Sequence, residues 1–357
     1  MHVVAPDRHT QAAAGARART RMRVSVLPGL KVDLRPGLFA LCLVPIASPL
    51  VVALCVPAFV IVGWILYPLY LSFAVRGAPE AAVESFFVNE TGAKKPFPSL
   101  QRDEGSVTLS VVVPAYNEQS RLPRMLDETI GYLERRRSRD AAFSWEVVVV
   151  DDGSKDQTME TALAYTKKYG SACVRVLQLA KNHGKGGAVM KGMLRARGDL
   201  LLMADADGAT RIGDVERLEE AMAALLQTSR GGFVVGSRFH MAHDDAARRT
   251  GVRGFVSMVF GIVVAFLVPG GVRDTQCGFK LMSRTAAREI IPRQKIWGWE
   301  FDCELIYLCV NVCKMPVAEV AVHWVDVAGS KLSVVSATLE IVRDLVLMRV
   351  LYGLGVW

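Results

Sequence analysis

The sequence of 357 residues is poor in cysteine, and its cysteines follow no pattern. Their number is odd, and none of their spacings is that of a zinc site or a disulfide framework. This excludes a small zinc module and a disulfide-stabilised secreted domain, and it predicts reduced thiols that face the cytosol. The cysteines are Cys42, Cys55, Cys173, Cys277, Cys303, Cys309 and Cys313.

The chain also lacks the phosphate-binding loop of P-loop NTPases. The run Gly184-Lys185-Gly186-Gly187 resembles such a loop, but no serine or threonine follows the lysine and the glycine spacing differs. We therefore exclude a P-loop NTPase. We find neither an internal repeat nor a long low-complexity run.

Charge is absent from residues 36–75, and mean hydropathy over the whole chain is positive. This stretch is twice as long as the about 20 residues that span a bilayer, so it predicts one kinked membrane helix or a hairpin. The tail before it, residues 1–35, is strongly basic. Such a tail is typical of a flank that faces anionic lipid rather than of a nucleic-acid arm, although a mitochondrial presequence has the same composition. Four prolines interrupt the uncharged stretch: Pro45, Pro49, Pro57 and Pro68.

Residues 76–106 contain several prolines and glycines and predict a linker. Beyond it, apolar runs alternate with segments of helical periodicity, which predicts an α/β domain with a mostly parallel sheet and helices on both faces. We assign residues 107–245 to a nucleotide-sugar-binding core and 246–357 to an acceptor-side and membrane-interface region. The expected strands are 109–113, 146–150, 174–179 and 199–204, and the expected helices are 122–137, 157–169 and 187–197.

Polar clusters follow three of the expected strands, at residues 114–118, 151–154 and 205–207. Asp205 and Asp207 are two residues apart where an apolar strand ends, so their side chains emerge on one side. Two such carboxylates suit Mg²⁺ or Mn²⁺, with substrate phosphates completing the coordination shell. Each cluster alone also fits a turn or a helix cap. Together, beyond the carboxyl ends of parallel strands, they predict a nucleotide-sugar site.

An ordered set of motifs resembles the family 2 glycosyltransferases, which have the GT-A fold. Within that family the chain is most similar to the branch that glucosylates dolichyl phosphate, and the resemblance covers about residues 107–357 and the N-terminal membrane segment. The mannosyl branch often has glutamine and arginine where this chain has Ala209 and Val325, which favours the glucosyl branch. The motifs are VVVPAYNE, VVVVDDGSKDQT, NHGKGGAVMKG, ADADGAT, VGSR, RDTQCGFKL, WEFDCEL and GSKL.

The resemblance implies roles for individual residues, which divide into donor-binding and catalytic groups. The catalytic candidates are Asp205 and Asp207, which hold the metal, Arg238 near the phosphates, and Asp274 and Gln276 near sugar and acceptor. The nucleotide-sugar-binding candidates are Pro114, Tyr116 and Glu118 around the nucleoside, Val150 and Asp152 around the base, Ala206 and Lys185, and Lys331, which closes over the diphosphate.

The activity that the resemblance implies is transfer of glucose from UDP-glucose to dolichyl phosphate. The product is dolichyl β-D-glucosyl phosphate, formed with inversion and used in N-glycan precursor assembly. A phosphate monoester has its second pKa near about 6, so the acceptor is largely a dianion at pH 7 and attacks without a general base. Two alternatives stay open: a polyprenyl-phosphate transferase that uses GDP-mannose or another acceptor, and a non-catalytic membrane protein that binds sugar nucleotides.

A lipid acceptor also accounts for the apolar stretch between Arg253 and Arg273. We expect interfacial helices here and at residues 334–357, with arginines at the level of the headgroups. Arg253, Arg248 and Arg249 are then candidates for binding the acceptor phosphate. The predicted partners are UDP-glucose, dolichyl phosphate and membrane lipid, with no nucleic acid; the oligomeric state stays open.

The predicted location is the endoplasmic reticulum membrane, with the catalytic domain in the cytosol. The basic tail places the N-terminus in the cytosol, and a single span would then place the catalytic domain in the lumen. Scattered cysteines and a cytosolic supply of nucleotide sugar favour the opposite side. A hairpin within residues 36–75 satisfies both requirements, and a single span with the tail in the lumen is the second choice.

Overall fold

The computed structural model divides into two units, Met1–Tyr67 and Pro68–Trp357. In the first unit, β1 (Met22–Leu27) and β2 (Leu30–Leu34) pair as an antiparallel two-stranded sheet within the basic tail. The predicted membrane segment, 36–75, lies outside the described residues apart from Gly63. The described residues are 22–27, 30–34, 63, 81–238, 270–325, 327 and 334–357.

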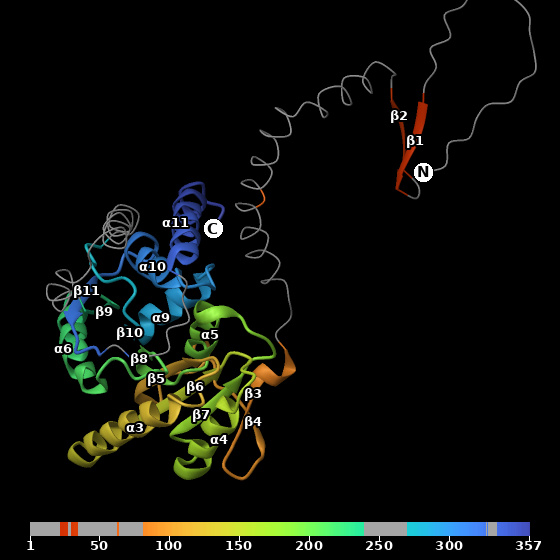
Figure 1. Cartoon of the computed structure of the whole chain (residues 1–357). Coiled ribbons are helices and arrows are strands. Elements are labelled where there is room, and N and C mark those ends of the chain that lie inside the picture. Colours follow the sequence, from red (N-terminus) through yellow and green to blue (C-terminus); the bar gives the residue numbers. More distant parts are fainter. Residues whose placement is uncertain are drawn as a thin grey trace, which may run out of the picture. The chain divides into compact units, whose positions relative to one another are not determined.

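A seven-stranded sheet lies at the centre of the second unit (Figure 1). Its strand order is β11-β9-β10-β8-β5-β6-β7, and β10 is antiparallel to both neighbours while the other pairs are parallel. The prediction of a mostly parallel α/β sheet is confirmed. The strands are β5 (Val107–Ala115), β6 (Trp145–Asp151), β7 (Val174–Gln178), β8 (Gly198–Ala204), β9 (Phe233–Ser237), β10 (Phe279–Ser283) and β11 (Val317–Ala321).

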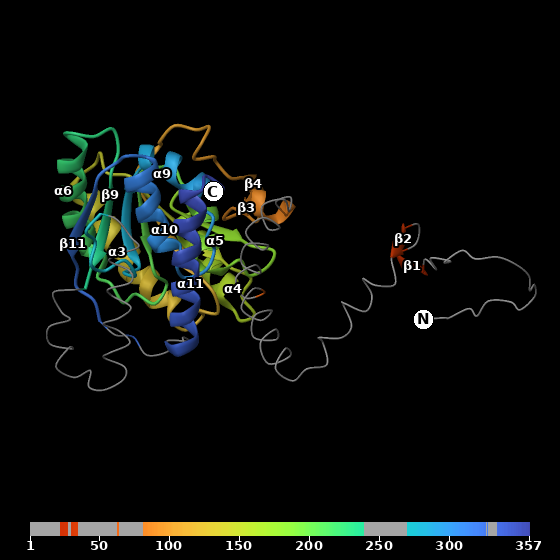
Figure 2. The same ribbon diagram turned by 90° about the horizontal axis from the view of Figure 1, so that it is seen from above.

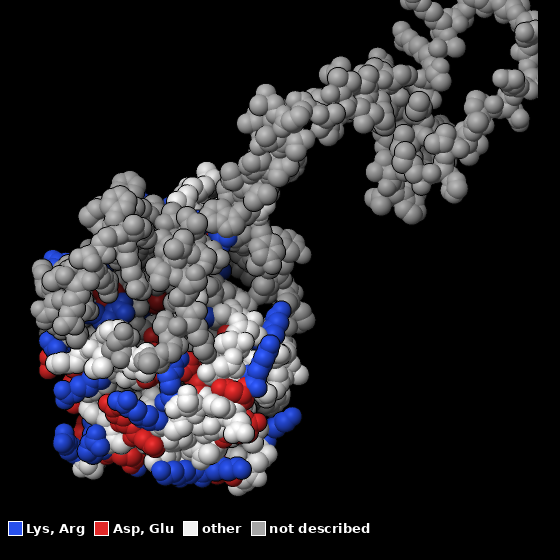
Figure 3. Space-filling model, viewed as in Figure 1, with Lys and Arg blue, Asp and Glu red and all other residues white. Residues whose placement is uncertain are grey.

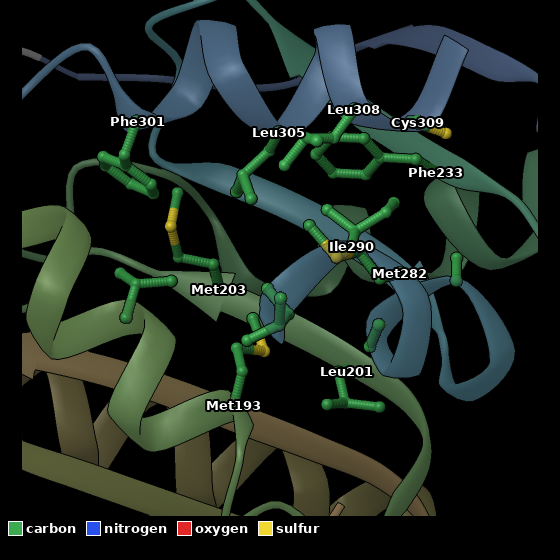
Figure 4. Close-up of a cluster of buried hydrophobic side chains, with 14 of the residues drawn as sticks. Met193, Leu201, Met203, Phe233, Met282, Ile290, Phe301, Leu305, Leu308 and Cys309 are labelled. Atoms are coloured by element: carbon green, nitrogen blue, oxygen red, sulfur yellow. The ribbon is translucent and has the colours of Figure 1, made fainter. Parts of the chain in front are cut away.

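Helices cover both faces of this sheet because side chains alternate along each strand (Figure 2). Val112 of β5 packs in the core with α5, α9 and α10, whereas Val111 packs in the core with α3, α4 and α6. Figure 4 shows the first core, in which Met203 of β8 lies near Phe301 of α10. The helices are α3 (Leu122–Arg139), α4 (Thr158–Tyr169), α5 (Gly184–Met193), α6 (Val215–Leu226), α9 (Arg284–Ile290), α10 (Phe301–Tyr307) and α11 (Val334–Gly353), with short turns η1 (Ala82–Ser85), η2 (Ile212–Asp214), η4 (Ile291–Arg293) and the π-helical η5 (Leu308–Val312).

The four expected strands and three expected helices are all present, and the largest difference is in α5. This helix begins at Gly184, three residues before the predicted start, and ends at Met193 instead of residue 197. Glycine is a poor helix former, so the periodicity placed the start after the glycine run. The glycines are required by packing: a Cβ on Gly186 would lie 2.6 Å from the Cβ of Phe301.

The segment predicted as a linker carries structure over its described residues, 81–106. It contains a short hairpin of β3 (Phe86–Val88) and β4 (Lys94–Pro96). Glu84 is 2% exposed and its carboxylate lies 2.5 Å from the ammonium group of Lys191 on α5. Leu100 is fully buried in the core beside α5. The prolines and glycines of residues 76–106 predicted a linker, but amino-acid composition carries no information about these long-range contacts.

The C-terminal helix α11 packs with one side and exposes apolar residues on another. Leu345 and Met348 are buried in the core shared with α10, whereas Val346 and Val350 are 45% and 49% exposed, and Leu354, directly after the helix, is 71% exposed. Within the described part of the chain, we find no helix whose length and apolar character would let it cross a bilayer.

Candidate active site

Four polar segments meet at one edge of the sheet. The parallel strands β6, β5 and β8 end there, at Asp151, Ala115 and Ala204, so the three predicted clusters come together. The antiparallel strand β10 begins at the same edge, since Phe279 pairs with Ala204. Residues 274–278 therefore arrive beside the end of β8.

The two aspartates after β8 are held differently. Asp205 has a side chain that is 32% exposed, and the Lys185 Nζ lies 2.7 Å from its Oδ1. Asp207 accepts a hydrogen bond of 2.9 Å from the backbone N–H of Ala209. Asp205 also explains the glycine before β10, because a Cβ on Gly278 would lie 1.9 Å from its Oδ2.

The donor set at the end of β8 fits a divalent cation that shares its shell with substrate. The described residues contain no group of three or more histidine, cysteine or acidic side chains arranged as metal ligands. Two carboxylates at a partly open strand end match the needs of Mg²⁺ or Mn²⁺, which take further oxygen ligands from phosphates and water. The ammonium group of Lys185 on Asp205 shows that this carboxylate already attracts a cation.

Asp152, after β6, lies in a closed environment. It is 3% exposed, and its Oδ1 accepts a hydrogen bond of 2.7 Å from the backbone N–H of His183. Burial raises the pKa of Asp152 to about 7, although hydrogen bonds from the backbone of His183 and Gly184 act in the opposite direction. Gly153 next to it has a φ of 69°, and its Cβ would lie 2.9 Å from the backbone nitrogen of Asn182. The loop therefore needs glycine at this position.

The remaining nucleoside candidates lie on β5 and β6. Pro114 pairs in register with Val150, and Tyr116 is 36% exposed just past β5. The Glu118 carboxylate is bound by Arg121, whose Nε lies 2.6 Å from Oε2 and whose second nitrogen bonds Oε1.

Sequence reasoning missed Arg121, although its i, i+3 spacing from Glu118 was an available signal. The hydrogen bond to Glu118 raises the pKa of Arg121, and the charges of Asp207 and Asp205 add to this effect. Arg121 is therefore within electrostatic reach of both aspartates after β8.

Arg238 and Asp274, two separate catalytic candidates, form one ion pair. The guanidinium donates to both carboxylate oxygens at 2.8 Å, and the Arg238 backbone N–H donates to Oδ2. Burial would raise the pKa of Asp274, but Arg238 outweighs it and holds that pKa below its ordinary value. The guanidinium also lies over the Trp324 ring, 5.4 Å from its centroid. Gln276 donates to the sulfur of Cys303 at 3.5 Å.

A buried ion pair that sequence reasoning missed lies next to Lys185. The ammonium group of Lys280, on β10, lies 2.8 Å from Asp302 on α10, and the side chains are 1% and 2% exposed. Burial would lower the pKa of Lys185, but the charges of Asp205 and Asp302 outweigh it and raise that pKa. Asp302, between Phe301 and Cys303 in the motif WEFDCEL, was the signal for a buried charge that needs a partner.

A family model described as "Glycosyl transferase family 2" matches residues 110–291. The dolichyl-phosphate beta-glucosyltransferase of Homo sapiens is 46% identical over 275 residues, which are 77% of this chain and 84% of that protein. The chain belongs to glycosyl transferase family 2. The resemblance drawn from the motifs is thereby confirmed, and the chain is a glycosyltransferase.

Other family 2 relatives have the same name. The protein of Dictyostelium discoideum is 41% identical, with coverage of 85% of this chain and 93% of that protein. The protein of Saccharomyces cerevisiae is 36% identical, with coverage of 72% and 78%. Among solved structures, glucosyl-3-phosphoglycerate synthase from Mycobacterium tuberculosis, in complex with Mn²⁺, UDP-glucose and phosphoglyceric acid, matches with a TM-score of 0.49 and 20% identity, and covers 70% of this chain and 82% of that chain.

Several of the candidate site residues lie outside the described residues. The three arginines expected at the acceptor phosphate are among them, as is Lys331. Ala206, between the two aspartates, is described and is buried, with 4% of the residue exposed. The candidates outside are Arg248, Arg249, Arg253 and Lys331.

Proposed function

We propose that this chain transfers glucose from UDP-glucose to dolichyl phosphate and forms dolichyl β-D-glucosyl phosphate with inversion. The observation that carries the proposal is the pair of aspartates after β8, with Asp205 in contact with Lys185, on the same sheet edge as Asp152. The relatives named dolichyl-phosphate beta-glucosyltransferase supply the identity of the acceptor and the sugar.

The donor nucleoside binds at the ends of β5 and β6. Asp152 is buried, and the backbone N–H of His183 fixes the orientation of its carboxyl group, which suits recognition of a ring N–H of uracil. Pro114 and Tyr116 supply an adjoining surface, and Glu118, held by Arg121, faces the ribose hydroxyls. The fixed carboxylate would accept from hydroxyls without having to be ordered on binding.

The diphosphate binds at the end of β8, where Asp205 and Asp207 hold Mg²⁺ or Mn²⁺. When bound, the cation acts as a Lewis acid that offsets the charge of the departing nucleoside diphosphate. Lys185 adds positive charge beside it, and Lys331 closes over the phosphates. Arg238, oriented by Asp274, places a planar guanidinium near the phosphate oxygens.

The acceptor supplies its own nucleophile. A phosphate monoester dianion needs no side chain to remove a proton, so the residues around it bind and orient rather than act as a base. Arg253, with Arg248 and Arg249, would hold this phosphate at the level of the headgroups. Gln276 is a candidate for contact with the sugar or the acceptor.

The exposed apolar side of α11 supports a membrane-surface location for the acceptor region. Val346 and Val350, four residues apart on one side of the helix, are both exposed, and exposed Leu354 follows the helix end, so apolar side chains gather where an interfacial helix would meet lipid. On the face shown in Figure 3, acidic and basic side chains are interspersed over the described part, whereas a nucleic-acid-binding face is typically uniformly basic.

The endoplasmic reticulum membrane, with the catalytic domain in the cytosol, is the proposed location. Asn89, in the turn of the β3–β4 hairpin, begins a glycosylation acceptor sequence and therefore reports the side of the membrane. We expect Asn89 to stay unmodified in cells. An endoglycosidase-sensitive mass shift at this residue would place the domain in the lumen.

The test is an assay of the full-length chain in detergent with dolichyl phosphate and Mg²⁺ or Mn²⁺. UDP-glucose, GDP-mannose and UDP-GlcNAc are compared as donors, and EDTA is the control. We expect metal-dependent transfer from UDP-glucose. Transfer from GDP-mannose alone would assign the chain to the mannosyl reaction, and nucleotide binding without any transfer would make it non-catalytic.

A further inference from the structure

Lys185 occupies a carboxylate that the proposed function assigns to the metal. Its ammonium group lies 2.7 Å from Asp205, and the two side chains are only 16% and 32% exposed. The lysine belongs to the first turn of α5, where Gly184 and Gly186 pack directly against Trp297 and Phe301. The backbone of this lysine is therefore fixed at a place from which its flexible side chain reaches Asp205.

A second carboxylate lies within electrostatic reach of the same lysine. Asp302 directly follows Phe301, whose side chain packs on Gly186 in the same turn as Lys185, and the charges of Asp205 and Asp302 both favour the ammonium form of this lysine against the effect of burial. Asp302 is anchored by Lys280 in a buried ion pair. Lys185 can therefore leave Asp205 without losing all of its favourable electrostatic interactions.

The charges of this cluster determine when a cation can enter. Three aspartates, Asp205, Asp207 and Asp302, act on the two lysines Lys185 and Lys280, which leaves one negative charge in excess. The nearby arginines do not change this balance, because Arg121 and Arg238 are each paired with a carboxylate of their own. A divalent cation alone would reverse this to an excess of one positive charge in a partly buried site, where like charges repel strongly. A cation that arrives with the two negative charges of a sugar nucleotide restores the original balance.

We propose that Lys185 neutralises Asp205 in the substrate-free enzyme and prevents tight binding of a divalent cation until the nucleotide diphosphate is present. On joint binding, the ammonium group turns from Asp205 toward the diphosphate and Asp302. The metal and the donor are thus thermodynamically coupled through one side chain. This inference rests on the proposed metal site at Asp205 and Asp207.

Mn²⁺ binding by the full-length chain, followed by the electron paramagnetic resonance signal of free Mn²⁺, tests the proposal without any turnover. In the absence of nucleotide, Lys185→Met should bind Mn²⁺ about tenfold more tightly than the unmodified chain, the size expected for removing one charge-assisted hydrogen bond. Lys185→Gln, also uncharged, should show the same gain, so the result does not depend on one variant. Lys185→Arg should bind as the unmodified chain does. Lys181→Met, at an exposed lysine four residues away, is the matched control and should change nothing.

A second titration, with UDP-glucose present, separates this inference from the proposed function. UDP-glucose should tighten Mn²⁺ binding strongly in the unmodified chain and much less in Lys185→Met. If neither uncharged variant binds Mn²⁺ more tightly without nucleotide, the role of Lys185 is overturned while the metal site stands. If Asp205→Asn binds Mn²⁺ together with UDP-glucose as the unmodified chain does, the metal site itself is overturned.

Discussion

The ends of β6 and β8 lie on one edge of the sheet and carry aspartates in opposite surroundings. Asp152, after β6, is 3% exposed, accepts hydrogen bonds from backbone, and has its pKa raised to about 7 by burial. Asp205, after β8, has a side chain that is 32% exposed and is paired with the ammonium group of Lys185. The first environment excludes water, and the second gathers charge.

Under the proposed function, this difference matches what each end would recognise. A nucleobase offers directional donors and acceptors but no charge, so a buried carboxyl group fixed by backbone N–H groups discriminates it well. A diphosphate and a divalent cation are recognised through charge and require an end that is open enough to admit them. The same residue type therefore serves two tasks, and the surrounding burial decides which.

The strongest test of this comparison is the loss of charge at the end of β8. Asp207→Asn and Asp205→Asn keep the shape of each side chain but remove an anionic ligand, so we expect glucosyl transfer to fall on the order of a thousandfold. Thermal unfolding should show that the fold is retained. Near-normal turnover of both variants, with an unchanged response to EDTA, would contradict the assignment.

The buried ion pair Lys280–Asp302, next to the end of β8, should contribute strongly to the free energy of unfolding. Asp302→Asn leaves the ammonium group of Lys280 buried without a counter-charge, which we expect to reduce the free energy of unfolding by about 3 kcal/mol. Denaturant titration measures this. The double variant Lys280→Met/Asp302→Leu, which removes both charges, should recover most of the loss. A single variant as stable as the unmodified chain would show that the pair is not structurally important.

The strands and helices that build this edge could be predicted from sequence. Apolar runs that end in polar residues, such as residues 199–207, indicate both a buried strand and the point where it reaches solvent. The order of strands and helices predicted a parallel sheet, and parallel strands end at one edge, so the three clusters were expected to meet. These features could be predicted because each depends on a pattern among residues that are close in the sequence.

Pairs between distant elements could not be predicted in the same way. Lys185 and Asp205 come from α5 and from the loop after β8, and Lys280 and Asp302 come from β10 and α10. Periodicity shows that a residue faces the core, but it does not show which partner it meets there. Strands β9, β10 and β11 were not predicted at all, and the antiparallel pairing of β10 with β8 is visible only in three dimensions.

The surroundings of Asp152 predict that the free energy of unfolding depends on pH. The folded state keeps a proton on Asp152 up to pH about 7, whereas an unfolded chain loses it near its ordinary value of 3.8. Unfolding therefore releases a proton between these values, and stability falls as pH rises through this window. Asp152→Asn has no such proton, so relative to the unmodified chain it should gain up to roughly 1.4 kcal/mol per pH unit between about pH 4 and pH 7.

Chemical denaturation at several pH values measures this difference, and Asp199→Asn, at an exposed aspartate on β8, is the matched control. The gain should level off above about pH 7, because Asp152 is then ionised in both states of the unmodified chain. A constant difference across the whole range would show that Asp152 keeps its ordinary pKa, and the contrast between the two strand ends would disappear.

The smallest expected effect comes from Arg253, whose proposed role is independent of the aspartates after β6 and β8. Arg253 directly precedes the long uncharged stretch and is proposed to bind the acceptor phosphate. Because a guanidinium forms two hydrogen bonds with a phosphate, Arg253→Ala should raise the KM for dolichyl phosphate by about tenfold at most and leave the KM for UDP-glucose unchanged. Arg253→Lys keeps the charge but not the paired donors, so its KM for dolichyl phosphate should lie between those of the unmodified chain and Arg253→Ala. Initial rates with each substrate varied in turn measure both KM values. A change confined to the KM for UDP-glucose would assign Arg253 to donor binding. The proposal that acceptor binding is separate from the charged site at the end of β8 would then be wrong.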